Sequence, residues 1–317
     1  MKKLIKTLCI LLSLSAFSQK TKNNEDLILF ERTLALQELV DYELIDLQNV
    51  DDTILTKEEK IKKEFAKEIK EDILHKIISG YNELIEKFPK SKLIFRALNN
   101  KGYAELQANM TDKAKETYLK IMNSQANDQE KGGIGSGIMA EPYANYKNRA
   151  CKVLAKIEID TKNYSEALRY LDQTNKYPYR HFCGNEYAAD AIYMATMYSN
   201  CYLALNDHEK AYDVLLPNIL ENGLADNSYL IKTAYEALLK KHRKEDLKIE
   251  FENAFKNIIT EKEISGKYEY TNYYIKFQNR KIQLEPWSLD VISSEDDLKK
   301  VATSILTNSE FYKLLTQ

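Results

Sequence analysis

Aromatic and basic side chains are concentrated in one short stretch of this chain, residues 177–187. Aromatic and arginine side chains are the preferred anchors of protein interfaces, and aromatic rings also stack on sugars. The stretch therefore predicts a loop that binds a protein or a glycan. The alternative is that its rings pack back onto the fold and stabilise a long loop. The candidate binding residues are Tyr177, Tyr179, Arg180, Phe182 and Tyr187.

His181 and Cys183 lie in the same stretch and raise the question of a metal site. Further ligands would have to come from Cys201 and His208, whereas a structural zinc site uses closely spaced pairs and usually four ligands. In a helix that starts just after the loop, Cys201 lies ~24 Å from its beginning at 1.5 Å per residue. That distance also rules out a disulfide between Cys183 and Cys201. We expect no metal and no cofactor, and we expect Cys151 to be a core thiol, with a bridge to Cys183 as the alternative.

A glycine-rich segment at residues 132–137 is the other candidate for chemistry. A phosphate-binding loop of the P-loop type follows a strand and ends in Gly-Lys-Ser/Thr, but here a polar helical stretch precedes the glycines and Ile138-Met139 follows them. We therefore interpret the segment as a flexible connector that a partner could order. The sequence contains no serine elbow, no His-Glu-x-x-His motif and no clear acid pair, so no catalytic residue is predicted. A net charge of −2 gives no basic surface for nucleic acid.

The elements that must position these residues are indicated by a pattern that occurs three times. A small residue is followed by alanine twelve residues later and by a large side chain four residues after that. In a pair of antiparallel helices, the small residue allows helix A to approach helix B, the alanine lies at the crossing, and the large side chain fills the adjacent groove. The occurrences are Gly102, Ala114 and Tyr118; Ala155, Ala167 and Leu171; and Ser199, Ala211 and Leu215.

This pattern resembles the tetratricopeptide repeat of secreted bacterial proteins, which carries glycine and alanine at the same two places. The resemblance covers residues 58–262 and implies an all-α solenoid, a superhelix of about four to five helix-turn-helix repeats. A degenerate first unit would place Phe65 and Ile77 at the two small-residue sites and Tyr81 at the large one. A weak last unit would place Tyr235, Leu247 and Phe251 at the same offsets.

The resemblance also implies a function, because this family holds a peptide or protein segment in a concave groove lined by the A helices. Basic side chains beside amides and tyrosines would suit an acidic or C-terminal peptide. The partner would be a protein or peptide that the sequence does not identify. In this register the groove residues are Arg96, Asn99 and Tyr103, then Arg149, Lys152 and Lys156, then Tyr193, Thr196 and Asn200.

The repeats are separated by two insertions. Ala114, Ala167 and Ala211 are 53 and 44 residues apart, whereas a plain repeat steps by 34. The additional residues lie near 125–141 and 177–187, both after a helix B, so we expect both loops at the same edge, where loops often form a binding face. An alternative function is therefore a glycan-binding module, similar to SusD-like outer-membrane proteins, which also use tetratricopeptide repeats. An enzyme ranks third.

The two ends of the chain differ from the repeats. Residues 1–18 have early lysines, a short apolar core and small residues before Gln19, which predicts a cleaved signal peptide and export to the periplasm or the medium. No later stretch predicts a transmembrane segment. An N-terminal helix is expected within 19–57, and Thr56 with Glu59 predicts a capping box at the start of the next helix.

Residues 263–317 are expected to form a small cap at the open end of the solenoid. Alternation at Ile275 and Phe277, and again at Ile282 and Leu284, predicts a β-hairpin with its turn at Asn279-Arg280. Ser294 then caps a last helix. The apolar stripe of that helix is Leu298, Val301, Ile305, Phe311 and Leu314. The scarcity of glycine (9) and proline (5) in 317 residues favours long helices elsewhere.

Overall fold

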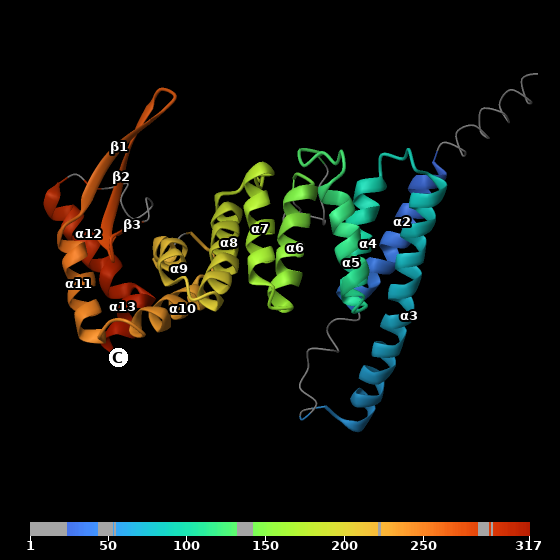
Figure 1. Ribbon diagram of the computed structural model, residues 1–317, viewed down its shortest axis with the longest axis horizontal. Coiled ribbons are helices and arrows are strands. Elements are labelled where there is room, and N and C mark those ends of the chain that lie inside the picture. The colour runs from blue at the N-terminus through green and yellow to red at the C-terminus, as the bar shows by residue number, and fades with distance from the viewer. Residues whose placement is uncertain are drawn as a thin grey trace, which may run out of the picture. The chain divides into compact units, whose positions relative to one another are not determined.

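The computed structural model describes residues 24–43, 53, 55–131, 142–220, 223–284, 292 and 294–317. Within these residues the chain forms twelve α-helices and one three-stranded antiparallel sheet (Figure 1). The chain is therefore mostly helical with a small C-terminal sheet, as the sequence indicates. The predicted signal peptide lies outside the described residues. In the part of the chain that is described, no helix is both long and apolar enough to cross a membrane.

The described residues divide into two compact units. The first comprises those within Met1–Asp128 together with Tyr146–Leu154, and the second those within Gln129–Asn145 and Ala155–Gln317. The first unit contains α2 (Glu25–Glu38), a π-helical turn (Leu39–Glu43), α3 (Lys57–Lys87), α4 (Ile94–Gln107), α5 (Thr111–Met122) and the start of α6 (Tyr146–Asp160).

The core of the first unit lies where α3 packs between α2 and α4. The rings of Phe30 and Tyr81 lie 5.9 Å apart at its centre, and both side chains are fully buried. At the start of α3, the Glu59 N–H donates to Thr56 Oγ1 and the Thr56 N–H donates to Glu59 Oε2. The predicted capping box is therefore confirmed.

The predicted first repeat within residues 58–88 is wrong, because α3 is one continuous helix. Phe65, which was expected at a packed helix crossing, is 62% exposed. Ile77 and Tyr81 are fully buried, but the helices that cover α3 are α2 and α4 and not a second helix from within residues 58–88. A Cβ atom built on Gly80 would lie 2.5 Å from Thr33 Oγ1, which marks the crossing with α2. No proline occurs between residues 57 and 87, so the sequence offers no strong turn signal there.

The second unit continues with helices and then the sheet. Its helical elements are the end of α6, α7 (Tyr164–Gln173), a 3₁₀ turn (Thr174–Lys176), α8 (Gly184–Ala204), α9 (His208–Leu215), a second 3₁₀ turn (Leu216–Asn218), α10 (Ser228–Leu239) and α11 (Lys244–Lys256). They are followed by β1 (Ile259–Ser265), β2 (Tyr268–Phe277), β3 (Arg280–Gln283), α12 (Glu295–Asn308) and α13 (Glu310–Thr316).

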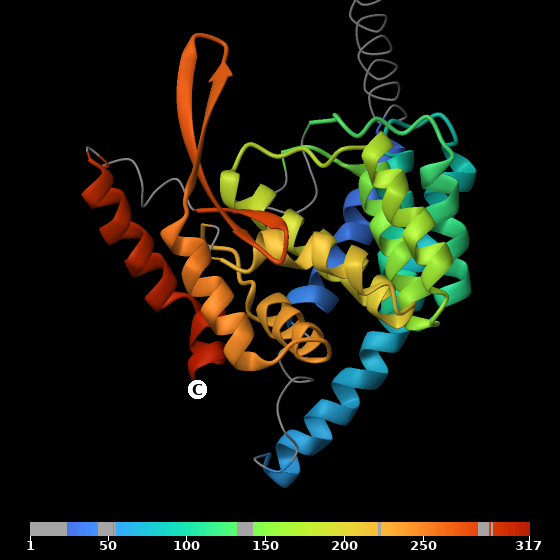
Figure 2. The ribbon, with the colours of Figure 1, turned by 60° about the vertical axis from the view of Figure 1, so that its left-hand side comes forward.

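The C-terminal region packs through a cluster of phenylalanine rings. Phe251 of α11 lies 5.0 Å from Phe277 of β2 and 5.1 Å from Phe311 of α13, each with an edge-to-face geometry that aromatic pairs prefer. The hairpin therefore rests on an apolar support, as a short hairpin must in water. Figure 2 shows the outer part of the β1–β2 ribbon extending away from these helices.

The sequence placed three boundaries of this region incorrectly. The β2–β3 turn is at Gln278-Asn279, whose φ angles of 49° and 61° suit a tight hairpin turn. A third strand, β1, begins at Ile259, inside the range assigned to repeats. The last helix is divided at Ser309, whose hydroxyl accepts the Tyr312 N–H and caps α13, while the predicted Ser294 cap is confirmed.

Candidate functional site

Three helix-to-helix turns share one geometry, which relates three parts of the chain. In each turn one residue has a positive φ, and the next N–H donates to the carbonyl five residues earlier, as in a Schellman-type helix end. The positive-φ residues are Asn109, Lys162 and Asn206, at 58°, 64° and 59°. The hydrogen bonds run from Met110 to Glu105 (2.8 Å), from Asn163 to Glu158 (2.7 Å) and from Asp207 to Tyr202 (2.8 Å).

The helix crossings next to these turns are as tight as predicted. A Cβ atom on Gly102 would lie 2.8 Å from Cε2 of Tyr118, so only glycine fits there without a shift. The alanines at the other crossings, Ala155, Ala167 and Ala211, are fully buried. The predicted pairing of α4 with α5 and of α8 with α9 is therefore confirmed, whereas the pairing of α6 with α7 stays a prediction that the burial of Ala155 and Ala167 supports. The pair α10 and α11 has a different turn, in which the N–H groups of Lys241 and His242 both donate to Leu238 O.

The first unit carries one group of predicted binding residues, which we call the basic stripe: Arg96, Asn99, Tyr103, Arg149 and Lys152. The beginnings of α4 and α6 lie side by side, since the rings of Phe95 and Tyr146 are 6.2 Å apart. Arg149 lowers the pKa of Tyr118 and Tyr103 raises it, although burial is the largest effect on that group. Both helices therefore contribute side chains around Tyr118.

Buried polar groups lie directly under the basic stripe. Asn99 donates to Asn100 Oδ1 (3.2 Å), Asn100 donates to the Tyr81 hydroxyl (3.1 Å), and that hydroxyl donates to Gln37 Oε1 (2.9 Å). Burial is the main reason that the pKa of Tyr81 is strongly raised. Asn99 is only 4% exposed, yet its Oδ1 receives no hydrogen bond from the described residues, nor does the buried Oε1 of Gln107. Each such acceptor costs about 1–3 kcal/mol.

The π-helical turn that follows α2 brings an acidic residue, Asp41, next to α4. Asp41 accepts a hydrogen bond from Gln107 Nε2 (2.8 Å), and its pKa is raised, mainly because its carboxyl is partly buried. Asp41 in turn raises the pKa of Tyr103, again after the effect of burial. Single π-helical turns occur frequently at functional sites. Neither Asp41 nor Gln107 was predicted as a site residue, since nothing in the sequence pairs them before the fold is known.

The second unit carries a different group, which we call the tyrosine stripe: Lys156, Tyr193, Thr196 and Asn200, with Tyr229 added by the structure. Lys156 forms an ion pair with Asp160 one turn later (2.5 Å), so its charge is already compensated. The Thr196 hydroxyl donates to the carbonyl of Ile192 in its own helix. The Tyr229 hydroxyl donates to Asn200 Oδ1 (3.5 Å). The pKa of Tyr193 is raised by burial and then by nearby acids, Asp190 and Asp160.

The aromatic loop of residues 177–187 is held together mostly by its own rings. The Tyr179 and His181 rings are nearly parallel, 6.1 Å apart, and Tyr179 meets Tyr187 edge-on at 6.0 Å. The Tyr187 hydroxyl both donates to His181 O and accepts from His181 N. Phe182 lies 4.9 Å from the His181 ring but is 72% exposed. The rings therefore stabilise the loop, and Phe182 remains available for contact.

Asn145, the last residue before α6, contacts the second insertion, while most of the first insertion lies outside the described residues, so a shared edge stays a prediction. The Asn145 side chain accepts from Arg180 N and donates to Arg180 O, both at 3.0 Å. A β-bridge between Lys131 and Tyr143 closes the base of the first insertion. The glycine-rich segment lies outside the described residues, so its predicted role as a connector stays a prediction.

The thiols do not form the metal site that the sequence raised. Cys183 is a free thiol whose N–H donates to His181 Nδ1, and it forms no bridge to another cysteine. Cys151 and Cys201 are fully buried, and burial raises the pKa of the Cys201 thiol to about 11. Across the described ranges, no group of three or more histidine, cysteine, aspartate or glutamate side chains is arranged to hold a metal ion.

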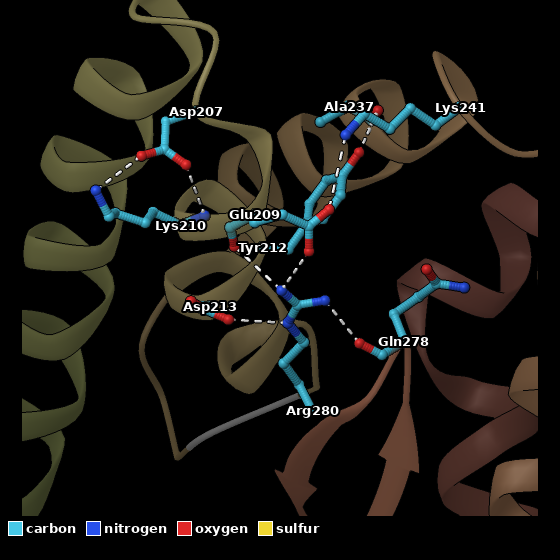
Figure 3. A network of polar contacts seen from close by, with 9 residues as sticks. All are labelled: Asp207, Glu209, Lys210, Tyr212, Asp213, Ala237, Lys241, Gln278 and Arg280. Carbon is cyan, nitrogen blue, oxygen red and sulfur yellow. Dashed lines mark hydrogen bonds and ion pairs between the residues drawn. The ribbon is translucent and has the colours of Figure 1, made fainter.

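A charged network fixes the sheet to the helices of the second unit (Figure 3). Arg280 donates from Nε to Asp213 Oδ1 and from Nη2 to Glu209 Oε2, each at 2.9 Å, and its Nη1 donates to Gln278 O. Its guanidinium also lies 5.7 Å from the centre of the Tyr212 ring. Because every contact is internal to the unit, we interpret this network as structural. From the sequence, Arg280 was predicted only as a turn residue.

No protein-family model matches the sequence, and a search of curated proteins found no match either.

Proposed function

We propose that this protein is an exported scaffold of the tetratricopeptide type that binds a peptide or protein segment through the exposed faces of its A helices. The observation that carries the proposal is the composition of the basic stripe. Polar side chains on a purely structural surface usually point into water, but here Asn99 is nearly fully buried and its neighbours Arg96 and Arg149 are half-buried. The repeated turn supports a scaffold, because it presents the A helices in a regular way.

The chemistry of the stripe favours an anionic segment as the ligand. Arg96, Arg149 and Lys152 supply positive charge, and arginine forms strong, often bidentate hydrogen bonds with carboxylates. Tyr103, which is 43% exposed, adds a hydroxyl that can pair with a peptide main chain. A segment with acidic side chains or a free C-terminal carboxylate fits these groups better than a neutral or basic one.

A defined acidic peptide tests the proposal. We expect a fluorescein-labelled peptide of four glutamates with a free C-terminus to bind the mature protein in low salt, measured by fluorescence anisotropy. The variant carrying Arg149→Gln and Lys152→Gln should bind about tenfold more weakly, since hydrogen bonds to charged groups contribute about 1.5–3 kcal/mol. A matched control carries Lys113→Gln and Lys120→Gln on α5, outside the stripe. Equal loss in both variants would show only unspecific charge attraction.

A glycan ligand is the second candidate, and the exposed Phe182 ring favours it. Next to Phe182, the parallel pair of Tyr179 and His181 continues the aromatic surface. Phe182→Ala removes the exposed ring without touching the hydrogen bonds of Tyr187. If the aromatic loop is a sugar site, affinity electrophoresis in gels containing soluble polysaccharides should show retardation that this variant loses.

Export is part of the proposal and has its own test. The charged, apolar and small residues of positions 1–18 support cleavage before Gln19. Intact mass of the native protein should correspond to a chain starting at Gln19. A native protein that retains Met1 would contradict export by this route.

A further inference from the structure

The first unit contains a group of acceptors that an anion-binding stripe does not explain. We call it the acidic pole: Asp41 and Tyr42 from the π-helical turn, and Tyr103 and Gln107 from α4. Residues 99, 103 and 107 are spaced by one helical turn, so they lie in one row along α4. The row therefore leads from the basic stripe at Arg96 to an acid at its other end.

The acidic pole combines a carboxylate with two tyrosine rings. The Asp41 carboxylate is partly buried and accepts one hydrogen bond, from Gln107 Nε2 at 2.8 Å. Tyr42 and Asp41 both lie near enough to Tyr103 to raise the pKa of its hydroxyl. Tyr42 is 63% exposed and Tyr103 is 43% exposed, so both rings can be reached from outside. A positive charge placed between them would gain ion-pair and cation–π stabilisation.

Two buried amide oxygens in the same row also lack donors. Asn99 Oδ1 and Gln107 Oε1 receive no hydrogen bond from the described residues, and Asn99 is more than nine-tenths buried. The nitrogen atoms of both amides are already used, by Asn100 and by Asp41. The Gln107 amide also interacts with the Tyr103 hydroxyl and lowers the pKa of that group, although burial, the largest effect, raises it. Beside Asp41, the Gln107 oxygen is an acceptor of the kind that the N–H groups of lysine and arginine can use.

We propose that the acidic pole binds the ammonium or guanidinium group of a basic side chain. Asp41 would pair with the charge, the rings of Tyr42 and Tyr103 would flank it, and Gln107 Oε1 would accept one of its N–H groups. If the proposed function is correct, this side chain belongs to the same segment that the basic stripe holds, so the inference rests on that function for the identity of the ligand. The preferred segment would then carry one basic residue beside acidic ones.

The titratable groups around Asp41 leave room for the positive charge of a ligand. Lys70 of α3 lowers the pKa of Asp41, but less than burial raises it, so the resident positive charge does not compensate for burial. Tyr81 of α3 and Tyr103 of α4 also lie within range, and both have raised pKa values, so neither becomes an anion at neutral pH. A cationic ligand is thus the group that would favour the ionised carboxylate, and its binding should weaken as acid protonates Asp41.

Saturation-transfer NMR with small probes tests the site without a peptide partner. The probes are N-acetyl-arginine amide and the uncharged N-acetyl-citrulline amide, which has nearly the same shape. We expect the arginine probe to bind the mature protein at least fivefold more tightly than the citrulline probe. Asp41→Asn should abolish this preference, because it removes the charge but keeps an acceptor for Gln107. The control Asp112→Asn, an exposed carboxylate on α5, should retain it.

The outcome that would overturn the site is equal binding of both probes, or a preference that survives Asp41→Asn. A thermal melt of Asp41→Asn must match that of the unmodified protein, and Tyr42→Ala offers a second variant that should weaken the arginine probe severalfold. The variant carrying Arg149→Gln and Lys152→Gln separates the two proposals. If that variant keeps the arginine preference while the tetraglutamate peptide never binds the unmodified protein, the scaffold function fails and the cation site stands.

Discussion

The basic stripe and the tyrosine stripe occupy corresponding places on helices of the same kind, yet their chemistry differs. In the first unit, Arg149 and Lys152 contribute positive charge beside the nearly buried Asn99. In the second, the corresponding places hold Tyr193, Thr196 and Asn200. Tyr193 lies near the acids Asp190 and Asp160. The comparison shows that the repeated turn determines where a side chain is presented, while the residue at that place determines what it can bind.

The largest expected effect concerns the helix crossings, because both stripes depend on them for their placement. Ala167 of α7, at the crossing predicted for α6 and α7, has no exposed surface. Ala167→Asp would bury an unpaired charge and also overpack the crossing, so we expect a loss of about 4 kcal/mol in the free energy of unfolding. Urea denaturation measures it. Ala189→Asp, at an exposed position of α8, should cost less than about 1 kcal/mol. Equal stabilities of the two variants would mean that the two stripes do not share a register.

The corresponding crossing in the first unit should be sensitive to a single methyl group. A Cβ on Gly102 would lie 2.8 Å from Cε2 and 2.9 Å from Cζ of Tyr118, and that ring is fully buried and cannot simply turn away. We expect Gly102→Ala to cost about 1–3 kcal/mol through overpacking, although alanine normally favours a helix by about 1 kcal/mol over glycine. Thermal melts followed by circular dichroism measure the change. A higher melting temperature would show that α4 and α5 separate easily.

Single lysine variants test whether the positive charge that binds the peptide lies in the basic stripe or in the tyrosine stripe. Lys152→Ala should weaken the tetraglutamate peptide severalfold, because Lys152 belongs to the basic stripe. Lys156→Ala should change that affinity by less than twofold, because Lys156 lies in the second unit, outside the basic stripe. Fluorescence anisotropy at one salt concentration compares them. A larger effect at Lys156 would reverse our assignment of the anion site.

The sequence predicted the helix crossings well, because they depend on side-chain volume at fixed spacing. Gly102 and Ala167 could be recognised from their neighbours alone. It failed at α3, where Ile77 and Tyr81 have the right pattern but pack against α2, whose Thr33 lies 47 residues before Gly80. Local patterns describe which face of a helix is buried, but not which helix covers it.

The acidic pole could not be predicted for a related reason. Asp41 is 66 residues from Gln107, and neither residue belongs to a motif. Asp41 also reaches α4 through a π-helical turn, and no simple periodicity indicates such a turn. Similarly, Arg280 meets Asp213 across 67 residues, and only the packing of the sheet on α9 brings them together. Polar contacts of long sequence separation are consequences of the fold.

The smallest expected effect concerns the pH dependence that distinguishes the acidic pole from the exposed acids near the tyrosine stripe. Burial raises the pKa of Asp41 above its ordinary value of 3.8. A carboxyl with a raised pKa binds protons more tightly in the folded protein, so the stability it contributes decreases as pH rises from near 3.8 through the raised pKa. The unmodified protein should therefore lose stability in that window relative to Asp41→Asn.

Measurement of both proteins by urea denaturation at several pH values isolates this contribution, because the other carboxyl groups are common to both. Asp160→Asn provides the comparison in the second unit. This substitution removes the exposed Lys156–Asp160 ion pair and is the control for the loss of a single carboxylate. The difference in the free energy of unfolding between the unmodified protein and Asp41→Asn could instead be constant with pH, or change in favour of the unmodified protein as pH rises. Either result would show that the negative charge of Asp41 is already stabilised in the free protein. The physical basis for a cation site beside the basic stripe would then be lost.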